Sequence, residues 1–324
     1  MRKSLITALF ATGIAAAASG IALAAADFPA RDLSIVVPYN AGGSADTLSR
    51  MMAEALTAKH GYSVIVENRP GAGGHIGAEY LLSKPADGHT LMLATISHNG
   101  AYKMYRNLRY DPAKDLVPVA MIAEAPNVLI VPSDSPFQSV QDILDTARAR
   151  PGELNYGSAG IGSGTHMAAE LFKHLAQVDI TAIPFSGGAP ALVALMAGQV
   201  DLNFETGVTA TKAIDSGKAR AIAVTGNTRS PVFPELPTIK ESGLPDYSMT
   251  LWYTLSVKSG TPEPVMKKLN ADINAVVSDP AFKKRLAQLG VDPIIASAEE
   301  AIARNKQEEK RWTAVIEAAG IQLD

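Results

Sequence analysis

The 324-residue chain contains no cysteine. This absence excludes disulfide bonds, thiolate catalysis and thiolate metal sites, so the folded state must depend on its apolar core. No cluster of Lys and Arg stands out, and the formal net charge is −3, which makes nucleic acid an unsuitable partner. No pair of histidines has a metal-ligand spacing such as His-x3-His. The sequence therefore predicts neither a metal site nor a cofactor.

Only the N-terminus carries an apolar run long enough to cross a membrane. Two basic residues precede the run LITALFATGIAAAASGIALA, and Ala-x-Ala patterns close it at Ala24 or Ala26. We interpret residues 1–26 as a secretory signal peptide that is cleaved near Ala24 or Ala26, which predicts an exported, periplasmic protein. An N-terminal membrane anchor is the alternative, but the Ala- and Gly-rich composition favours removal. Loss of two positive charges would take the net charge from −3 to −5.

The length and composition predict a globular protein of two lobes. A chain of 324 residues exceeds what one hydrophobic core usually organises, while 47% hydrophobic and 19% charged residues are ordinary values. Apolar, strand-like segments alternate with helical patterns, which predicts an α/β fold with parallel sheets covered on both sides. The segments are LSIVVPY, YSVIVEN, TLMLAT, NVLIVP, DITAIPF, VDLNFE, RAIAVTG and LWYTLSV.

The helical patterns have recognisable starts and ends. The first expected helix has Ser44 as N-cap and Gly61 as C-cap. Its apolar face repeats at helical spacing and consists of Leu48, Met51, Met52, Ala55 and Leu56. The C-terminal third predicts helices over residues 262–276, 279–289 and 298–318, the last with a capping box of Ser297 and Glu300.

Two strand-rich, proline-punctuated segments are the expected connection between the lobes. They cover residues 119–132 and 246–262. A hinge of two crossing strands at these segments would place residues 27–125 and 250–324 in lobe 1 and residues 126–249 in lobe 2.

Three glycine-rich loops each follow a strand and precede a helix. They lie in VVPYNAGGSAD (36–46), LNYGSAGIGSGTHMAAELF (154–172) and IPFSGGAPALVALMAGQV (183–200). Glycine lets the backbone approach a ligand, and a helix start offers unpaired N–H groups with a partial positive charge. Such a loop binds an anion without Lys or Arg, although any α/β protein also uses glycine in these turns. One helix start contributes only roughly 0.3–1 kcal/mol, so several must converge from both lobes around a small carboxylate-like anion.

A fourth glycine-rich run, PGAGGHIGAEYL (70–81), is near the dinucleotide fingerprint. Its glycine spacing is wrong, and a proline interrupts its start. An exported protein also lacks a nicotinamide pool, so a helix start near the cleft between the lobes is the better interpretation.

Single polar residues beside these loops have two interpretations each. Asp46 either interacts favourably with the helix dipole or binds a ligand amine or an ordered water. Glu205 ends a strand and either binds a ligand amine or an ordered water in the same way, or caps or pairs locally. His98 follows a strand end, where ligand contacts are expected, whereas His166 lies in a first helical turn and has no preferred direction.

The sequence contains no evident catalytic constellation. Gly-x-Ser-x-Gly is absent, because the run GIGSG is offset by one position, and no carboxylate pair suits acid–base chemistry. We therefore expect a binding protein and not an enzyme. An exported hydrolase that uses Ser158 or Ser163 as its nucleophile is the alternative.

The same segments carry a family resemblance. IVVPYNAGGSADTLSRMMAEAL, VIVENRPGAGGHIGAEYL, PADGHTLMLAT, ARPGELNYGSAGIGSGTHMAAELF and ALMAGQVDLNFE resemble the solute-binding proteins of tripartite tricarboxylate transporters, often called Bug receptors. The resemblance covers nearly the whole mature chain. It implies a fold like that of type II periplasmic binding proteins, in which two α/β lobes joined by two crossing strands close on a ligand in the cleft between them.

The resemblance also implies a function. Such receptors hold a small organic acid, aliphatic or aromatic, through backbone amides, hydroxyl groups and ordered water, and deliver it to the permease subunits of a membrane transporter. A ligand sensor for a signalling partner is an alternative role. We expect a monomer.

By position, the resemblance implies a set of ligand-binding residues. The opening loop contributes Tyr39, Ala41, Gly42, Gly43, Ser44 and Asp46, the loop over 158–165 contributes Ser158, Ala159, Gly160 and Thr165, and Thr95, His98, Phe185, Ser186, Glu205 and Thr206 flank them.

Four departures from the family pattern fall at or beside these positions. Asn40 stands where Pro or Ala is frequent, and Glu205 stands where Asp is common. Phe185-Ser186 replaces a common Tyr-Lys, and NGAYKMY after His98 differs from the usual AINPALY. These departures leave the identity of the acid open.

Overall fold

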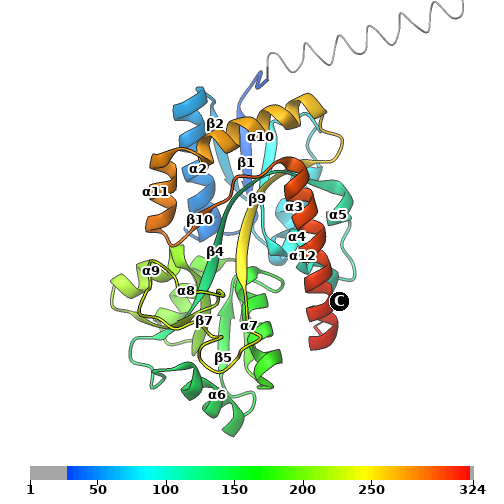
Figure 1. Ribbon diagram of the computed structural model, residues 1–324. Coiled ribbons are helices and arrows are strands. Elements are labelled where there is room, and N and C mark those ends of the chain that lie inside the picture. The colour runs from blue at the N-terminus through cyan, green and yellow to red at the C-terminus, as the bar shows by residue number, and fades with distance from the viewer. Residues whose placement is uncertain (1–27, 322–324) are drawn as a thin grey trace, which may run out of the picture.

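One long strand, β4 (Leu116–Pro132), runs through both halves of the computed structural model, which describes residues 28–321. The signal peptide expected over residues 1–26 lies outside the described residues. The first part of β4 pairs with β9 (Thr250–Lys258) up to the pair Pro126–Thr250, and its second part pairs with other strands. Figure 1 shows β4 and β9 side by side, running from the half that contains α10 toward the half that contains α6.

The first half-sheet is built on the residues of β4 up to Pro126. Its strand order is β2 (Val64–Asn68), β1 (Leu33–Val37), β3 (Thr90–Ala94), β9 and β4, and β10 (Asp292–Pro293) also pairs with β4. Strand β1 is parallel to β2 and β3, whereas β9 is antiparallel to both β3 and β4. Every residue of β3 is buried, as expected for a continuously apolar strand inside a covered sheet.

The second half-sheet is built on the residues of β4 from Asn127 onward. It contains β6 (Thr181–Pro184), β5 (Asn155–Ser158), β7 (Leu202–Thr206) and β4 in that order, and β8 (Ala219–Val224) also pairs with β4. Strand β5 is parallel to β6 and β7, and β4 is antiparallel to β7 and β8.

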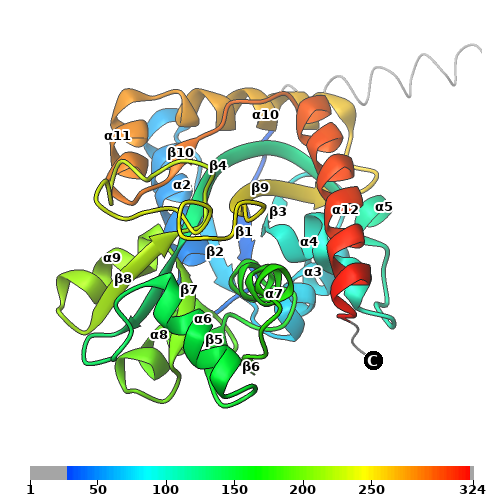
Figure 2. The ribbon, with the colours of Figure 1, turned by 60° about the horizontal axis from the view of Figure 1, so that its bottom comes forward.

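Helices cover both half-sheets (Figure 2). The longer helices beside the first half-sheet are α2 (Ser44–His60), α3 (His75–Leu82), α10 (Glu263–Val277), α11 (Pro280–Gln288) and α12 (Ala298–Ala319). Shorter turns there are η1 (Ala72–Gly74), α4 (Ile96–Asn99), η2 (Ala101–Met104) and α5 (Pro112–Asp115). The second half-sheet has α6 (Val140–Ala149), α7 (Gly164–Ala176), α8 (Gly188–Met196) and α9 (Gly207–Asp215). Helix α12 contacts β4 and also α7, so it reaches from the first half to the second.

Local sequence explains the course of helix α2. Four of the five residues on its predicted apolar face are buried, and the fifth, Ala55, is half-buried against the same core. The helix ends where Gly61 takes φ +71°, a left-handed conformation that favours glycine, and donates its N–H to the Thr57 carbonyl. The prediction of Gly61 as C-cap is confirmed. The prediction of Ser44 as N-cap is wrong, because extended Gly43 takes that place and Ser44 is the first helical residue.

The three predicted C-terminal helices agree with α10, α11 and α12 to within a residue at each end. The capping box of Ser297 and Glu300 is also present. The prediction of parallel sheets holds only in part, because β4 passes from one half to the other and both β4 and β9 run antiparallel to their neighbours. Over residues 28–321, no helix is long and apolar enough to cross a membrane. The lobe boundaries at residues 125/126 and 249/250 stay a prediction.

Candidate functional site

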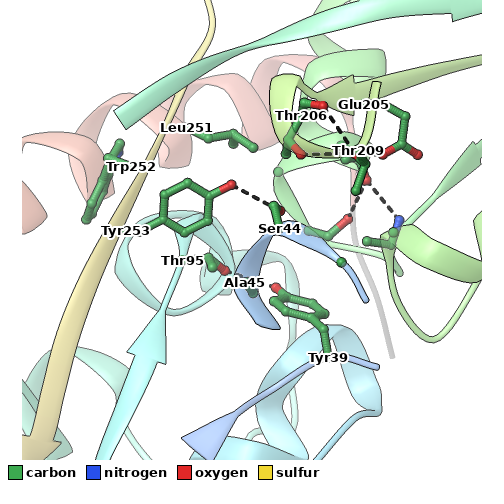
Figure 3. Close-up of a pocket in the computed structure, with 16 residues that line it drawn as sticks. Tyr39, Ser44, Ala45, Thr95, Glu205, Thr206, Thr209, Leu251, Trp252 and Tyr253 are labelled. Carbon is green, nitrogen blue, oxygen red and sulfur yellow. Dashed lines mark hydrogen bonds between the residues drawn. The ribbon is translucent and has the colours of Figure 1, made fainter. Parts of the chain in front are cut away.

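A cavity of about 50 Å³ lies between the two half-sheets and is lined by residues of both (Figure 3). The first half contributes Tyr39, Gly43, Ser44, Ala45, Thr95, Leu251, Trp252 and Tyr253, and the second contributes Ala159, Ser163, Gly164, Thr165, Gly188, Glu205, Thr206 and Thr209. Since roughly 10–15 Å³ measured in this way holds one water molecule, the cavity has room for a few water-sized groups. This size suits a small molecule or part of one.

Four helices begin at the wall of this cavity. Residues of the first turn or the N-cap of α2, α7, α8 and α9 all belong to its lining. Each strand-to-helix turn places its helix start at the carboxyl end of a strand, where open α/β sheets bind ligands. Four partial positive charges therefore point toward one small volume, and they come from opposite halves of the molecule.

The starts of three of these helices lack a side-chain cap. Helices α2, α8 and α9 follow Gly43, Gly187 and Thr206, and none of these residues accepts a backbone N–H of the first turn through its side chain. Helix α7 differs, because Ser163 Oγ accepts a hydrogen bond of 3.3 Å from the His166 N–H. Unpaired N–H groups at a helix start bind an anion when no side chain satisfies them. The site thus offers backbone donors to an anionic ligand.

Hydroxyl groups supply most of the remaining polar lining. Tyr39 Oη lies 2.9 Å from both Thr95 Oγ1 and Ser97 Oγ, and Tyr253 donates a hydrogen bond of 3.3 Å to Ser44 Oγ. Figure 3 shows the Tyr253 hydroxyl directed at Ser44 across the cavity wall. Burial raises the pKa of Tyr253 to about 12 and also raises the pKa of Tyr39, so both phenols are neutral hydrogen-bonding groups at physiological pH.

Glu205 is the carboxyl group of the lining. It sits near the end of β7, and only 1% of its surface is exposed. Its Oε2 accepts a hydrogen bond of 2.6 Å from Thr209 Oγ1, and its Oε1 accepts one of 3.2 Å from Asn203 Nδ2. Burial raises the pKa of Glu205 to about 7, although these two hydrogen bonds act in the opposite direction. Among the described residues that line the cavity, none is Lys, Arg or His.

Asp46 lies beside the site but does not line it. Its carboxylate accepts hydrogen bonds from the Gly42 N–H at 2.9 Å and from Asn68 Nδ2 at 3.0 Å, and it pairs with Arg50 at 2.9 Å. Burial alone would raise the pKa of Asp46, but the bonds from Arg50, Gly42 and Asn68 outweigh it and lower this pKa. These contacts indicate that Asp46 fixes the opening loop, a role that neither sequence interpretation named.

His98 stands behind the site rather than in its wall. Its Nε2 lies 3.1 Å from the Gly74 carbonyl, and its Nδ1 accepts the Thr95 N–H at 3.4 Å in the capping box of α4. Burial lowers the pKa of His98 to about 4, so the ring is neutral and Nε2 carries the hydrogen that it donates to Gly74. His98 thereby holds Thr95 in position. His166 is also buried, and burial lowers its pKa to about 4.

The serines proposed as alternative nucleophiles have no imidazole partner. Ser158 Oγ is buried without any hydrogen-bond partner, and it lies outside the lining. Ser163 Oγ lies 3.1 Å from Thr165 Oγ1 and accepts the His166 backbone N–H, as a helix cap does. Within residues 28–321, His, Asp and Glu form no group of three or more that would hold a metal ion.

Loops of the two halves touch beside the cavity. Asn40 Nδ2 donates a hydrogen bond of 2.6 Å to Ser186 Oγ, and the Tyr105 hydroxyl donates one to the Ile161 carbonyl. At Gly73 (φ +61°) a side chain would overlap that same Ile161 carbonyl oxygen. Asn40, Gly73 and Tyr105 belong to the first half, whereas Ile161 and Ser186 follow β5 and β6 of the second half. The structure therefore represents a closed arrangement of the halves.

The structure brings together half of the residues expected to bind the ligand. Those that line the cavity are Tyr39, Gly43, Ser44, Thr95, Ala159, Thr165, Glu205 and Thr206, and those that do not are Ala41, Gly42, Asp46, His98, Ser158, Gly160, Phe185 and Ser186. The lining also contains Ala45, Ser163, Gly164, Gly188, Thr209, Leu251, Trp252 and Tyr253, which the sequence reasoning did not select as binding residues. Residues 251–253 lie in LWYTLSV, and their position in an expected crossing strand was the available signal. Ligand contact by any of these residues stays a prediction.

Comparison with known proteins places this arrangement in a family. A family model described as "Tripartite tricarboxylate transporter family receptor" matches residues 48–321. The structure of R. palustris Rpa4515 with adipate is 37% identical, with a TM-score of 0.88 and coverage of 91% of this chain and 99% of that chain. MatC (Rpa3494) from Rhodopseudomonas palustris with bound malate is 33% identical, with a TM-score of 0.85 and coverage of 89% and 100%. The periplasmic binding protein BugD is 32% identical, with a TM-score of 0.87 and coverage of 91% and 99%.

The fold and the cavity between its halves define a solute-binding protein of the periplasmic-binding-protein type. The chain belongs to the receptor family of the tripartite tricarboxylate transporters, because the family model matches most of its length. The resemblance carried by the sequence motifs is thereby confirmed, as are the α/β binding-protein fold and the expectation of a receptor instead of an enzyme.

Proposed function

We propose that this receptor captures a small organic acid by its carboxylate group in the cavity between the two halves. The convergence of four helix starts on one cavity carries the proposal, since three of them lack a side-chain cap. An anion replaces the water that these N–H groups would otherwise require. The Rpa4515 structure with adipate and the MatC structure with malate support a carboxylate as the ligand class.

Micromolar binding of an anion requires free-energy contributions from both halves of the molecule. One helix start contributes roughly 0.3–1 kcal/mol to an exposed anion and up to about 2 kcal/mol in a partly buried geometry. A hydrogen bond to a charged group adds about 1.5–3 kcal/mol. Micromolar affinity needs about 8 kcal/mol after the cost of ordering. This free energy of binding is reached when the starts of α2 in one half and of α7, α8 and α9 in the other contact the ligand together. Ligand binding is therefore linked to closure of the two halves.

We further propose that the ligand is passed to the permease subunits of a membrane transporter. Membership of the receptor family supports such a partner. A periplasmic location, with removal of residues 1–26 near Ala24 or Ala26, follows from the signal-peptide pattern. The BugD structure, described as a periplasmic binding protein, supports the same location. The receptor acts as a monomer in this proposal.

Isothermal titration calorimetry with malate, adipate and benzoate tests the ligand class, with the corresponding neutral amides as controls. The proposal expects at least one acid to bind at micromolar concentration and to be recovered unchanged. Its amide should bind at least tenfold more weakly, because the amide lacks the charge that the helix starts stabilise. Equal affinity for acid and amide would contradict the proposal. Native mass spectrometry of protein purified without refolding gives the mass of any retained ligand.

A further inference from the structure

Glu205 presents an unusual combination in a cavity that is built for an anion. Its side chain lines the same small volume as the four helix starts, and it is almost completely buried. The described lining offers no cationic side chain to neutralise it. A carboxylate ligand in this volume of about 50 Å³ shares the cavity with this carboxyl group. Two like charges in one desolvated site disfavour the ionisation of one of them.

The groups that contact Glu205 directly are neutral. Thr209 Oγ1 and Asn203 Nδ2 hydrogen-bond its two oxygens, and Gly188 at the start of α8 lies next to Oε2. Asn203 is itself held, because its Nδ2 donates to the Ala191 carbonyl and its Oδ1 accepts the Gly157 N–H. The carboxyl group is therefore fixed in place without a counter-ion.

Charged and titratable groups on the surrounding elements do not replace a counter-ion. Tyr253 of β9 is the titratable side chain that interacts electrostatically with Glu205, and it is neutral, as shown above. Helix α8 (GAPALVALM) and strand β5 (NYGS) carry no charged residue, and β4 places Val128 opposite Glu205. On α9, Lys212 and Asp215 are exposed, and Asp46 of α2 is occupied by Arg50 and Asn68.

We propose that Glu205 is a protonated, neutral carboxyl group in the ligand complex and shares its proton with an anionic oxygen of the bound acid. The inference rests on the proposed function, since it requires a carboxylate ligand. In the complex the ligand oxygen accepts a hydrogen bond from Glu205, and no charge is left unpaired between them. Above about pH 7 the proton binds together with the ligand and returns to solvent on release. Glu205 acts as a specificity-determining residue, because an ionised Glu205 repels the acid.

The predicted pH dependence follows from the free receptor. Burial places the pKa of Glu205 at about 7, so at about pH 6 most free receptor already carries the proton and binding takes up little. At about pH 9 free Glu205 is ionised, and binding must take up nearly one proton per ligand. Affinity therefore falls about tenfold per pH unit above about pH 7, which amounts to roughly 100-fold by pH 9.

Calorimetric titration of the mature protein with malate and adipate, in buffers of different ionisation enthalpy, measures the number of protons taken up. We expect uptake to rise from near zero at about pH 6 to nearly one at about pH 9. Glu205→Gln keeps the shape of the side chain and cannot ionise. This variant should bind without proton uptake and with an affinity that does not fall with pH. Asp215→Asn, an exposed carboxyl on the neighbouring helix α9, is the matched control and should behave as the wild type.

The wild-type titration decides the inference even where Glu205→Gln does not fold. Ligand binding that takes up no proton at about pH 9, with unchanged affinity, would overturn the role of Glu205 and leave the proposed function intact. The absence of binding by any acid at about pH 6, where Glu205 is protonated, would overturn both. Release of nearly one proton on binding at about pH 6 would also contradict the inference, because free Glu205 carries its proton there and would have to ionise in the complex.

Discussion

Asn40 and Ser186 join the two halves of the receptor by a hydrogen bond of 2.6 Å from Asn40 Nδ2 to Ser186 Oγ. Asn40 follows β1 in the first half, and Ser186 follows β6 in the second. Neither residue lines the cavity, yet both belong to the glycine loops that form its edge. Both positions also depart from the family pattern that the sequence resembles. The bond therefore stabilises the closed arrangement from outside the cavity lining.

Removing this bond should weaken ligand binding without weakening the fold. Asn40→Ala or Ser186→Ala removes a partly solvent-exposed hydrogen bond worth about 0.5–1.5 kcal/mol, which lowers the population of the closed state. We expect affinity to fall about two- to tenfold, and the double variant to resemble either single variant. Calorimetric titration measures the affinity, and urea unfolding measures the stability. Gln141→Ala removes an exposed bond within α6 and is the control. Additive losses in the double variant would show that the two residues act independently.

A methyl group at Gly73 should prevent closure. The Cβ of Gly73→Ala would overlap the Ile161 carbonyl oxygen of the other half and the Tyr105 hydroxyl. We expect ligand affinity to fall at least tenfold and small-angle scattering to report a larger radius of gyration with ligand present. Gly61→Ala is the matched control, because Gly61 has a similar positive φ of +71° but no atom within 4 Å of the added Cβ. An equal loss of affinity in both variants would assign the effect to backbone strain instead of closure.

Capping helix α2 with a side chain should lower affinity while preserving stability. Gly43 has extended φ and ψ of −77° and 175°, and a Cβ there makes no contact closer than 3.8 Å. In Gly43→Ser, the new hydroxyl accepts a hydrogen bond from the first turn and so occupies a donor that the ligand needs. We expect a stability change within a few tenths of a kcal/mol and an affinity loss of about tenfold.

Pro262→Ser is the control for this substitution. It introduces the same residue at the N-cap of α10, which also lacks a side-chain cap but does not contribute to the cavity. Its affinity should equal that of the wild type. Unchanged affinity in Gly43→Ser would exclude the α2 start from the binding site.

Buried histidines should destabilise the receptor in acid. Burial lowers the pKa of His98 to about 4 and of His166 to about 4, whereas both have a model-peptide pKa near 6.5. Because the unfolded chain binds protons first, stability is complete above about pH 6.5 and is lost as the pH falls toward 4. Each histidine accounts for the loss of up to about 3 kcal/mol of the free energy of unfolding. Glu205 has the opposite effect on the pH dependence of stability. Because its pKa is raised on folding, its contribution to the free energy of unfolding is largest below about pH 4.5 and is lost as the pH rises through about 7.

The variant His98→Gln isolates one of these contributions. Gln suits the third position of a capping box, so it preserves the start of α4. Urea unfolding at about pH 7.5, 6 and 5 should show a smaller loss of stability in acid than in the wild type. The comparison variant is His174→Gln, which makes the same substitution at a less buried position in the last turn of α7. A steeper acid loss in His98→Gln would contradict this assignment.

The sequence predicts the secondary elements well, because apolar periodicity and glycine stops determine them locally. Helix α2 illustrates this, with its apolar face and with Gly61 at its end. The site is harder to predict, since it depends on which loops meet. Thr209 lies in the first turn of α9, where its hydroxyl donates a hydrogen bond to Glu205 and its side chain contributes to the cavity. Leu251 and Tyr253 enter because β9 begins where the two halves meet. The sequence indicates a connecting strand there but not which of its side chains face the cavity.

Other residues were expected at the site because they are close to it in sequence. Asp46, three residues beyond Gly43, turns away to hold the Gly42 N–H and Arg50. His98 follows Thr95 but reaches back to Gly74. In both cases the polar side chain forms hydrogen bonds with residues of the first half and does not line the cavity. Sequence alone gives the position of such a side chain along the chain, but not the hydrogen bond that fixes its direction.

A crystal structure of the receptor with bound malate or adipate tests the central claim most directly. We expect carboxylate oxygens within hydrogen-bond distance of backbone N–H groups at the starts of α2 and of at least one of α7, α8 and α9, with no Lys or Arg side chain in contact. A carboxylate held by a cationic side chain, or by one half of the molecule alone, would contradict it.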